Sequence, residues 1–368
     1  MQRLAWTDNL RALMIIFVVM MHAAVTYGGI GGWYYIENEK VDMGSTIFFA
    51  VYQSFSQAYF MSLLFLFSGY FTRKSLLKKG TLKFLSGRFY RLGIPLLIYI
   101  FILHPLNVKM AYPDLELWHF YKHGIIDLNL FSWTGPMWFV EALLIFSLIY
   151  VMLRKIPLIQ KKLIFKLNAP NLSLLILFIT AFAFGTRLIF PIGTDVVNLQ
   201  LCYFPAYLVM FFAGIVAHSQ DIFNNLDYRT GIRWLIISFA IGLPAWFLII
   251  IFGGPLKGIM LIEGGLNWPA FFYALWESFF CVAFITALIG IFRHRYNNQN
   301  RFQKFLSDNA FGVYVFHATI LIGISVILKD LTMPPVPKFF MVFSIAIMAS
   351  YLFSWLIRKI PIAKILFS

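Results

Sequence analysis

The chain has 368 residues, of which 61% are hydrophobic and only 12% are charged, and its mean hydropathy is +0.79. Soluble domains carry about a quarter charged residues, so this composition excludes an ordinary soluble protein. The formal net charge of +15 would suit nucleic-acid binding if the charges formed one patch. They are instead spread between apolar stretches, so no nucleic-acid partner is expected.

Apolar runs of about twenty residues, long enough to cross the hydrocarbon core of a bilayer, recur along the whole chain. They fall near 10–30, 46–72, 92–112, 134–153, 171–191, 201–217, 232–252, 268–292, 309–328 and 337–357. We therefore predict an all-α, polytopic membrane helix bundle with about ten transmembrane helices. We expect residues 1–368 to form a single integral-membrane domain, because no linker or soluble segment interrupts the pattern.

The charged residues between the spans indicate the orientation. With the N-terminus in the cytoplasm, most Lys and Arg fall on the cytoplasmic side, as the positive-inside rule requires. These basic clusters lie at 73–91, 154–166, 229–233, 293–304 and 358–364. The opposite loops hold most of the acidic residues, namely Glu37, Glu39, Asp42, Asp114, Glu116, Asp127, Asp195, Glu263 and Asp330. We therefore expect both termini to be cytoplasmic.

The first span, "TDNLRALMIIFVVMMHA" at 7–23, carries Arg11 and His22. With Asp8 as the expected N-cap of its helix, these two residues are about 16 Å apart along one stripe of that helix. A histidine this deep is costly and usually faces a cavity or a substrate path, and its pKa suits proton transfer. Two simpler interpretations stay open: Arg11 as a topological anchor, and His22 as a hydrogen-bonding partner of a neighbouring helix.

Three further titratable residues lie inside predicted spans: Glu141, Glu277 and His317, the last expected about 13 Å beyond an N-cap at Asp308. Together with His22 they could form a proton relay, an ion path or a catalytic chamber, and each alone could simply join two helices. We expect no metal site among them, because their spacing is not that of metal ligands. Cys202 and Cys281, also inside spans, are expected to pack as small apolar residues without a disulfide.

"FLSGRFYRLGIPLLI" at 84–98 places Arg88 and Arg91 three residues apart at the cytoplasmic start of the third span. A shared helical face would let the two guanidinium groups bind phosphate, as in a phosphorylated cosubstrate arriving from the cytosol. Topological charge explains them equally well. Pro95 is expected to kink or begin this span.

These motifs together resemble acyltransferase family 3 of integral membrane enzymes. The resemblance rests on the first-span pair Arg11 and His22, "LFLFSGYF" in the second span, Arg88 and Arg91, "GPMWFVEALL", and "YVFH" ending at His317. The segment 186–218 looks like the glucan biosynthesis protein C branch, whose members are thought to succinylate periplasmic glucans.

The resemblance implies an acyltransferase that moves an acetyl or succinyl group from cytosolic acyl-CoA to a hydroxyl of an extracytoplasmic glycan or similar acceptor. It implies His22 as the catalytic residue, either general base or acyl carrier, with Arg11 positioning the donor or the histidine. Arg88 and Arg91 would bind the acyl-CoA phosphates, and Glu141, Glu277 or His317 would orient the imidazole or relay its proton.

No permanently bound cofactor is expected, only acyl-CoA as cosubstrate. The expected location is a bacterial plasma membrane, with membrane lipid around the chain and a homo-oligomeric state left open. The alternative is a secondary transporter or exporter of a glycan or lipid-linked intermediate, because intramembrane charges also suit that class. A structural scaffold would leave the buried titratable residues without a role.

Overall fold

The computed structural model describes residues 4–37, 41–154 and 167–367. Most of the basic cluster at 154–166, together with Glu39, lies outside these residues. The described residues are mostly helical, and their only bridge joins Val196 to Leu199. The predicted all-α membrane fold is therefore confirmed.

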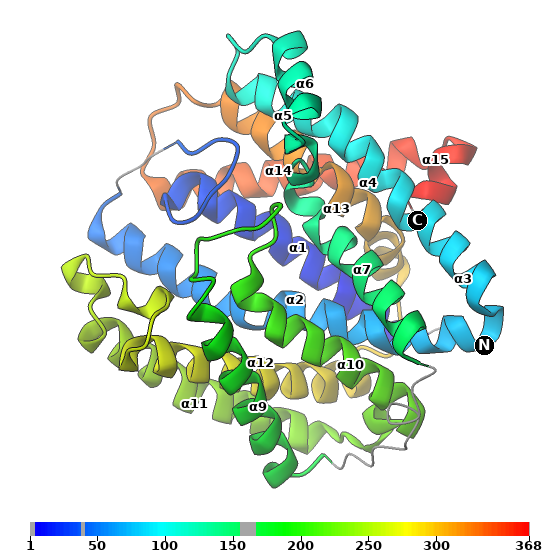
Figure 1. Cartoon of the computed structure of the whole chain (residues 1–368), viewed down its shortest axis with the longest axis vertical. Helices are drawn as coiled ribbons and strands as arrows, with labels where there is room; N and C mark the ends of the chain where they lie inside the picture. Colours follow the sequence, from blue (N-terminus) through cyan, green and yellow to red (C-terminus); the bar gives the residue numbers. More distant parts are fainter. Residues whose placement is uncertain (1–3, 38–40, 155–166, 368) are drawn as a thin grey trace. The chain divides into compact units, whose positions relative to one another are not determined.

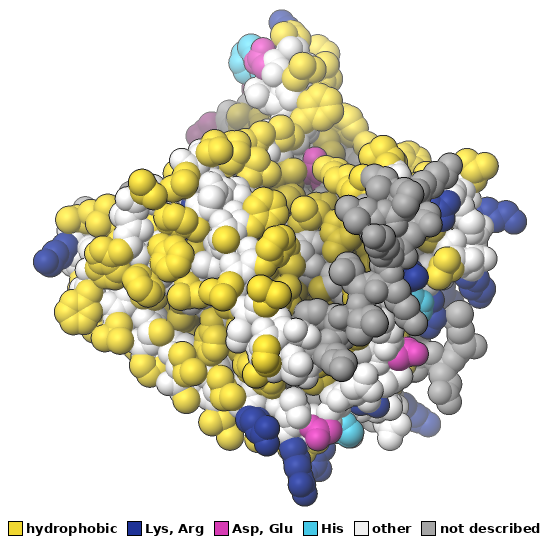
Figure 2. Space-filling view, turned by 60° about the horizontal axis from the view of Figure 1, so that its bottom comes forward, with side chains coloured by type: hydrophobic (Ala, Val, Ile, Leu, Met, Phe, Trp, Pro, Cys, Tyr) yellow, Lys and Arg dark blue, Asp and Glu magenta, His cyan; other side chains and the backbone are white. Residues whose placement is uncertain are grey.

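Nine helical stretches of the described chain are long and apolar enough to cross a membrane. The expected span at 46–72 is not one of them, although it lies in the long helix α2 (Met43–Lys79). Its polar residues, which include Gln53, Gln57 and Ser62, interrupt the apolar run and lower its hydropathy. The face shown in Figure 2 is covered largely by hydrophobic side chains, with Lys and Arg mainly at its margins.

The chain forms two compact units that are discontinuous in sequence. Unit 1 comprises 1–7, 57–84 and 145–298, and unit 2 comprises 8–56, 85–144 and 299–368. Four of their five boundaries fall inside α1, α2, α3 and α7, and the fifth lies between residues 298 and 299, outside any helix.

In unit 1, α11 packs along α12, and α9 contacts both α10 and α12 (Figure 1). The bounds of these helices are Ala169–Arg187 for α9, Phe204–Gln220 for α10, Tyr228–Phe252 for α11 and Trp268–Arg295 for α12. Small residues allow these close approaches: a Cβ on Gly231 would lie 2.9 Å from the backbone nitrogen of Ile291. Cys202 and Cys281 are buried free thiols in this unit, as predicted.

In unit 2, α13 (Arg301–Ile327) lies along α14 (Pro335–Ile357), and the α1 residues Ala23, Ala24 and Tyr27 share a buried cluster with both helices. The Tyr27 hydroxyl donates to Ser325 Oγ at 3.2 Å. Small alanines bring helix backbones close, and a hydrogen bond between helices adds a modest gain. This packing is what carries His22 toward α13.

The helices of unit 2 and those that cross its boundaries complete the fold. Their bounds are Ala5–Gly28 for α1, Thr81–Arg88 for α3, Ile94–Ile98 for α4, His104–Ala111 for α5, Leu117–Ile126 for α6, Trp138–Leu153 for α7 and Pro361–Leu366 for α15.

Two expected helix starts are wrong. Helix α1 begins at Ala5, before the expected cap at Asp8, because Trp6 is buried and makes edge contacts with Phe67 and Phe223 that hold an extra turn. Helix α13 begins at Arg301, where Asn300 and Gln303 form a capping box, so Asp308 lies inside the helix.

Candidate functional site

Helix α1 carries Arg11 and His22 in unit 2. The Arg11 guanidinium lies 3.2 Å from the Asp8 carboxylate, one turn earlier, and its side chain is 43% exposed. An ion pair at this spacing holds the arginine head near the end of the helix. His22 lies far along the same helix among mostly buried neighbours and is itself partly exposed.

The imidazole rings of His22 and His317 are stacked, with centroids 5.3 Å apart and planes 24° from parallel. His317 comes from α13 and is fully buried. The structure thus brings together two of the predicted site residues from distant parts of the sequence. Each imidazole can carry a proton or attack a carbonyl carbon, so the pair can divide these two tasks.

Hydrogen bonding fixes the tautomer of His317. Its Nδ1 lies 2.7 Å from the backbone oxygen of Tyr314, and because an oxygen only accepts there, Nδ1 must carry the hydrogen. The Nε2 atom is buried and has no hydrogen-bond partner among the described residues. In the neutral ring, Nε2 therefore presents a lone pair that can accept a proton.

The indole of Trp33 stacks on the imidazole of His22, with ring centroids 3.9 Å apart and planes 16° from parallel. Trp33 lies in the segment 29–37 that follows α1. The Glu37 backbone nitrogen donates to Thr26 O at 2.9 Å, and the Glu37 carboxylate lies 2.6 Å from Nζ of the buried Lys338. These bonds fold the segment back onto unit 2 and hold the indole over the histidine.

Tyr34, the next residue, joins this segment to the third span. Its hydroxyl lies 2.7 Å from His104 Nδ1 and 3.0 Å from the hydroxyl of Tyr99, to which Asn107 Nδ2 donates at 3.0 Å. Burial raises the pKa of the Tyr34 phenol, so the phenol keeps its proton. The ring of Tyr34 also packs edge-on against Trp33, with centroids 5.1 Å apart.

The "GPMWFVEALL" segment contributes to the same region. Gly135 has φ +48°, and a Cβ there would lie 2.4 Å from the Tyr34 hydroxyl. The backbone oxygen of Pro136 accepts a hydrogen bond from the Tyr314 hydroxyl. Glu141, in the first turn of α7, is half-buried, and Thr134 donates to its carboxyl group. Its Oε2 has no partner among the described residues.

Arg88 and Arg91 lie at the start of the third span, where the helix is not uniform. Arg88 ends α3, and Arg91 lies in a π-helical turn, Phe89–Gly93. Arg88 is half-buried and Arg91 is exposed, so the two guanidinium groups differ in access. Helix α15, which carries Lys364, packs against this turn. Two segments that carry cationic residues and are distant in sequence therefore lie side by side here.

Glu277 belongs to unit 1, where it forms a buried ion pair with Arg187 of α9. The Arg187 guanidinium also lies 5.7 Å from the rings of Tyr203 and Tyr273. A buried charge inside a membrane protein is usually paired in this way. The carboxylate of Glu277 therefore already has a cationic partner, and a catalytic role for it stays a prediction.

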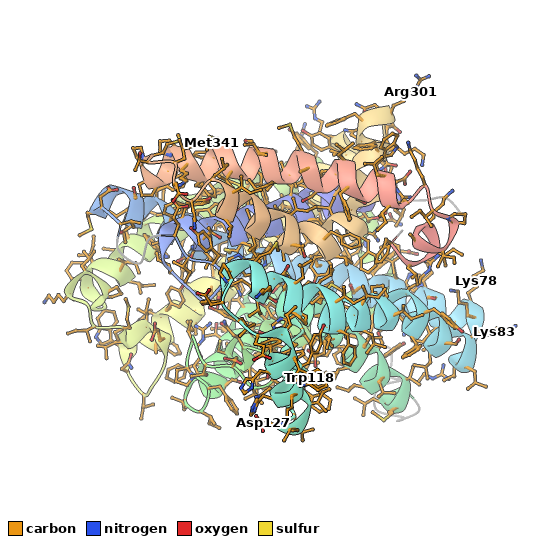
Figure 3. The ribbon with its side chains drawn as sticks, turned by 90° about the horizontal axis from the view of Figure 1, so that it is seen from above. Lys78, Lys83, Trp118, Asp127, Arg301 and Met341 are labelled. Atoms are coloured by element: carbon orange, nitrogen blue, oxygen red, sulfur yellow. The ribbon has the colours of Figure 1, made fainter. Side chains whose placement is uncertain are left out.

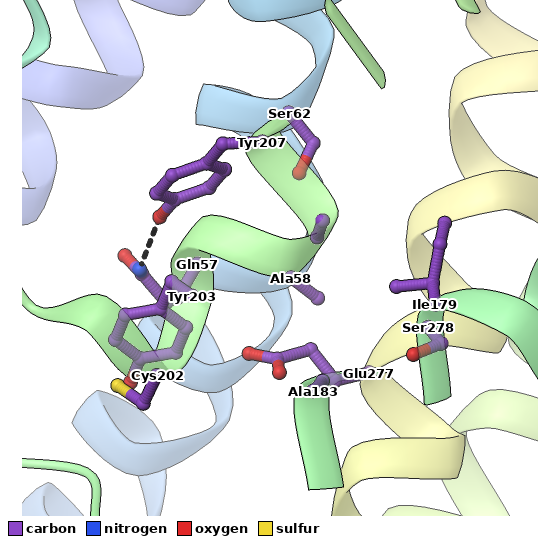
Figure 4. Close-up of a pocket in the computed structure, with 11 residues that line it drawn as sticks. Gln57, Ala58, Ser62, Ile179, Ala183, Cys202, Tyr203, Tyr207, Glu277 and Ser278 are labelled. Carbon is purple, nitrogen blue, oxygen red and sulfur yellow. Dashed lines mark hydrogen bonds between the residues drawn. The ribbon is translucent and has the colours of Figure 1, made fainter. Parts of the chain in front are cut away.

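Glu277 lines a small cavity in unit 1, together with Gln57, Tyr203 and Tyr207 (Figure 4). Gln57 Nε2 donates to the Tyr207 hydroxyl at 2.9 Å. The cavity volume of about 10 Å³ is near the minimum for one water molecule, so it does not hold an acyl group in this state.

Trp33, Tyr34 and His104 were missed by sequence reasoning, because only the fold shows that Trp33 stacks on His22, that Tyr34 packs on Trp33 and that His104 bonds to Tyr34. Sequence reasoning also passed over His119 and His123, one turn apart on α6, where His123 Nδ1 lies 3.1 Å from Asp127. Trp118 and Asp127 mark this helix in Figure 3. No group of three metal-ligating side chains occurs in the part of the chain that the structure describes.

Comparison with known proteins places the chain in a family. The family model described as an acyltransferase domain matches residues 4–359. No curated protein and no solved structure matches the chain significantly. The match includes most of both units and every site residue described above except Lys364.

Proposed function

This chain belongs to acyltransferase family 3, and from that premise we propose that it moves an acyl group from cytosolic acyl-CoA to a hydroxyl of an extracytoplasmic glycan or similar acceptor. The observation that carries the proposal is the stacked pair His22 and His317, in which His317 Nε2 is buried without a hydrogen-bond partner among the described residues. One imidazole can hold the acyl group while the other takes the proton of the acceptor hydroxyl.

In the acyl-carrier mechanism, a ring nitrogen of His22 attacks the thioester carbonyl carbon and the C–S bond breaks. The CoA sulfur leaves with the proton from the other His22 nitrogen, so a neutral acyl-imidazole remains. The acceptor oxygen then attacks the acyl carbon, its proton passes to His317 Nε2, and the C–N bond breaks. His317 returns that proton to His22, which restores both neutral rings.

In the general-base mechanism, His22 takes the hydroxyl proton directly while the acceptor oxygen attacks the thioester carbonyl carbon. The C–S bond then breaks, and the CoA sulfur leaves with the proton that His22 took. The two mechanisms differ in one observable. Single-turnover mixing of labelled acyl-CoA with the protein, without acceptor, releases CoA and leaves label on His22 only in the acyl-carrier mechanism.

We assign Arg88, Arg91 and Lys364 to the phosphates of acyl-CoA, because the helix that carries Lys364 packs against the start of the third span, which we expect to face the cytoplasm. Guanidinium groups bind phosphate bidentately. Arg11 is paired with Asp8 near the N-terminal end of α1. It would contact the pantetheine arm or orient His22. A permanently bound cofactor has no part in this scheme.

The likeness of 186–218 to the glucan biosynthesis protein C branch supports succinyl-CoA and a glucan as the first donor and acceptor to assay. We propose that the protein lies in a bacterial plasma membrane, where both substrates and membrane lipid are present. Self-association into a homo-oligomer is compatible with this scheme, which uses the residues of one chain.

The test is acyl transfer from labelled acyl-CoA by the purified protein and by His22→Gln at equal protein levels. Loss of general acid–base catalysis alone costs about 10²–10⁴-fold, so the variant should lose nearly all transfer. Undiminished transfer by the variant would refute the proposal, and glycan flux without any acylated product would support an exporter instead.

A further inference from the structure

Trp33 has an unused hydrogen-bond donor at the site. Its Nε1 atom is buried and lacks a hydrogen-bond partner among the described residues, although the N–H of a buried tryptophan normally finds one. The indole lies flat on the imidazole of His22, at 3.9 Å between centroids. The N–H therefore lies close to the ring on which the proposed function places the reaction.

The position of this N–H is fixed before any substrate arrives. Four residues after Trp33, the Glu37 backbone nitrogen donates to Thr26 O, and Lys338 Nζ binds the Glu37 carboxylate at 2.6 Å. Next to Trp33, the Tyr34 hydroxyl is held by His104 and Tyr99. Donors that are held in place in a water-poor site stabilise developing charge most effectively, because they need not reorganise during the reaction.

The two buried, unpaired groups around His22 are chemically complementary. His317 Nε2 presents a lone pair and so suits the proton of the acceptor hydroxyl, whereas the indole N–H of Trp33 can only donate. When a nucleophile attacks the acyl carbonyl carbon, the C=O π electrons move to the oxygen, which becomes negative and needs a donor. These electrons form the C=O π bond again when the C–S or C–N bond breaks.

We infer that the Trp33 indole N–H donates to the acyl carbonyl oxygen during transfer at His22. This inference rests on the proposed function and assigns Trp33 as a further catalytic residue. It applies to the acyl-carrier and general-base mechanisms alike, because both pass through a tetrahedral oxyanion.

The test compares Trp33→Phe with the wild type in kcat and in KM for acyl-CoA. Phenylalanine keeps an aromatic ring over His22 but removes the donor. Loss of one oxyanion donor lowers kcat by about 10²–10³-fold, so we expect that loss with KM nearly unchanged. Replacement of Trp33 by benzothienylalanine, which has sulfur in place of the N–H and nearly the same shape, should give the same loss.

Trp118→Phe is the matched control, because it removes an indole N–H from a side chain that is 75% exposed on α6. It should retain wild-type kcat. A benzothienylalanine variant within twofold of the wild type would overturn the inference, as would a raised KM at unchanged kcat. If instead His22→Gln stays fully active, the proposed function itself fails, and the two failures are therefore distinguishable.

Discussion

His317 is buried on α13, with one ring nitrogen bonded to a backbone oxygen and the other unpaired among the described residues. An unpaired buried nitrogen is costly for stability, and a hydrocarbon-filling residue would avoid that cost. In the proposed mechanism, the unpaired lone pair beside the stacked ring of His22 takes the proton of the acceptor hydroxyl.

His317→Asn tests this use. The asparagine amide can replace Nδ1 as donor to Tyr314 O, but it offers no lone pair at the place of Nε2. We expect the variant to fold and bind acyl-CoA normally and to lose about 10²–10⁴-fold in transfer rate, measured with labelled acyl-CoA. His317→Gln, whose amide reaches the place of Nε2, is the paired control. Equal activity of His317→Asn and wild type would contradict the proton-accepting role.

The sequence pointed to His22, His317 and Arg11 as candidates, because ionisable residues inside apolar spans are few, and the catalytic roles of all three stay predictions. It could not select Trp33 or Tyr34 among 10 Trp and 18 Tyr, because their roles depend on how the segment 29–37 folds back. It also could not show that Glu277 has Arg187 as a partner, since the two are far apart in sequence.

The third span shows how an element departs from a regular helix. It contains two π-helical turns, Phe89–Gly93 and Tyr99–Leu103, and each is followed after one residue by a proline, Pro95 and Pro105. A proline ring collides with the carbonyl one turn earlier, and a widened turn relieves that contact. The first widened turn carries Arg91, and His104 directly follows the second. Pro95 indicated a disturbance of the helix, but its π-helical form was not predictable.

Gly135, in the "GPMW" turn, lies against the hydroxyl groups of Tyr34 and Tyr99. In Gly135→Ala, the new Cβ would lie 2.4 Å from the Tyr34 hydroxyl, and the residue would keep a positive φ that costs about 1–3 kcal/mol for a side chain. We therefore expect a lower apparent melting temperature and weaker acyl transfer. Gly185→Ala on α9 is the control, because its Cβ meets nothing within 4 Å. Identical melting of Gly135→Ala and wild type would show that the contact is unimportant.

At the scale of the whole molecule, the span pattern and the loop charges predict the orientation. Extracytoplasmic loops would then include α6, and cytoplasmic loops the α2–α3 connection, near which Lys78 and Lys83 lie in Figure 3. Sequence periodicity could predict the spans because each must be apolar to cross lipid. It could not predict the two compact units, whose segments are interleaved along the chain.

Cysteine labelling tests this orientation. Asp127 and Lys83 are both exposed, and the native Cys202 and Cys281 are buried. A membrane-impermeant maleimide should label Asp127→Cys in intact cells, but Lys83→Cys only after permeabilisation. The unsubstituted protein should remain unlabelled in both conditions. The opposite labelling pattern would invert the topology and move Arg88 and Arg91 away from cytosolic acyl-CoA.

The central claim, that this chain uses His22 to acylate a cell-surface hydroxyl, is tested most directly by mass spectrometry of surface glycans. Cells that lack the gene would express either the wild type or His22→Gln at equal membrane levels. We predict glycan species heavier by one acyl group with the wild type and their absence with the variant. Equal amounts of acylated glycan with both proteins would contradict the claim.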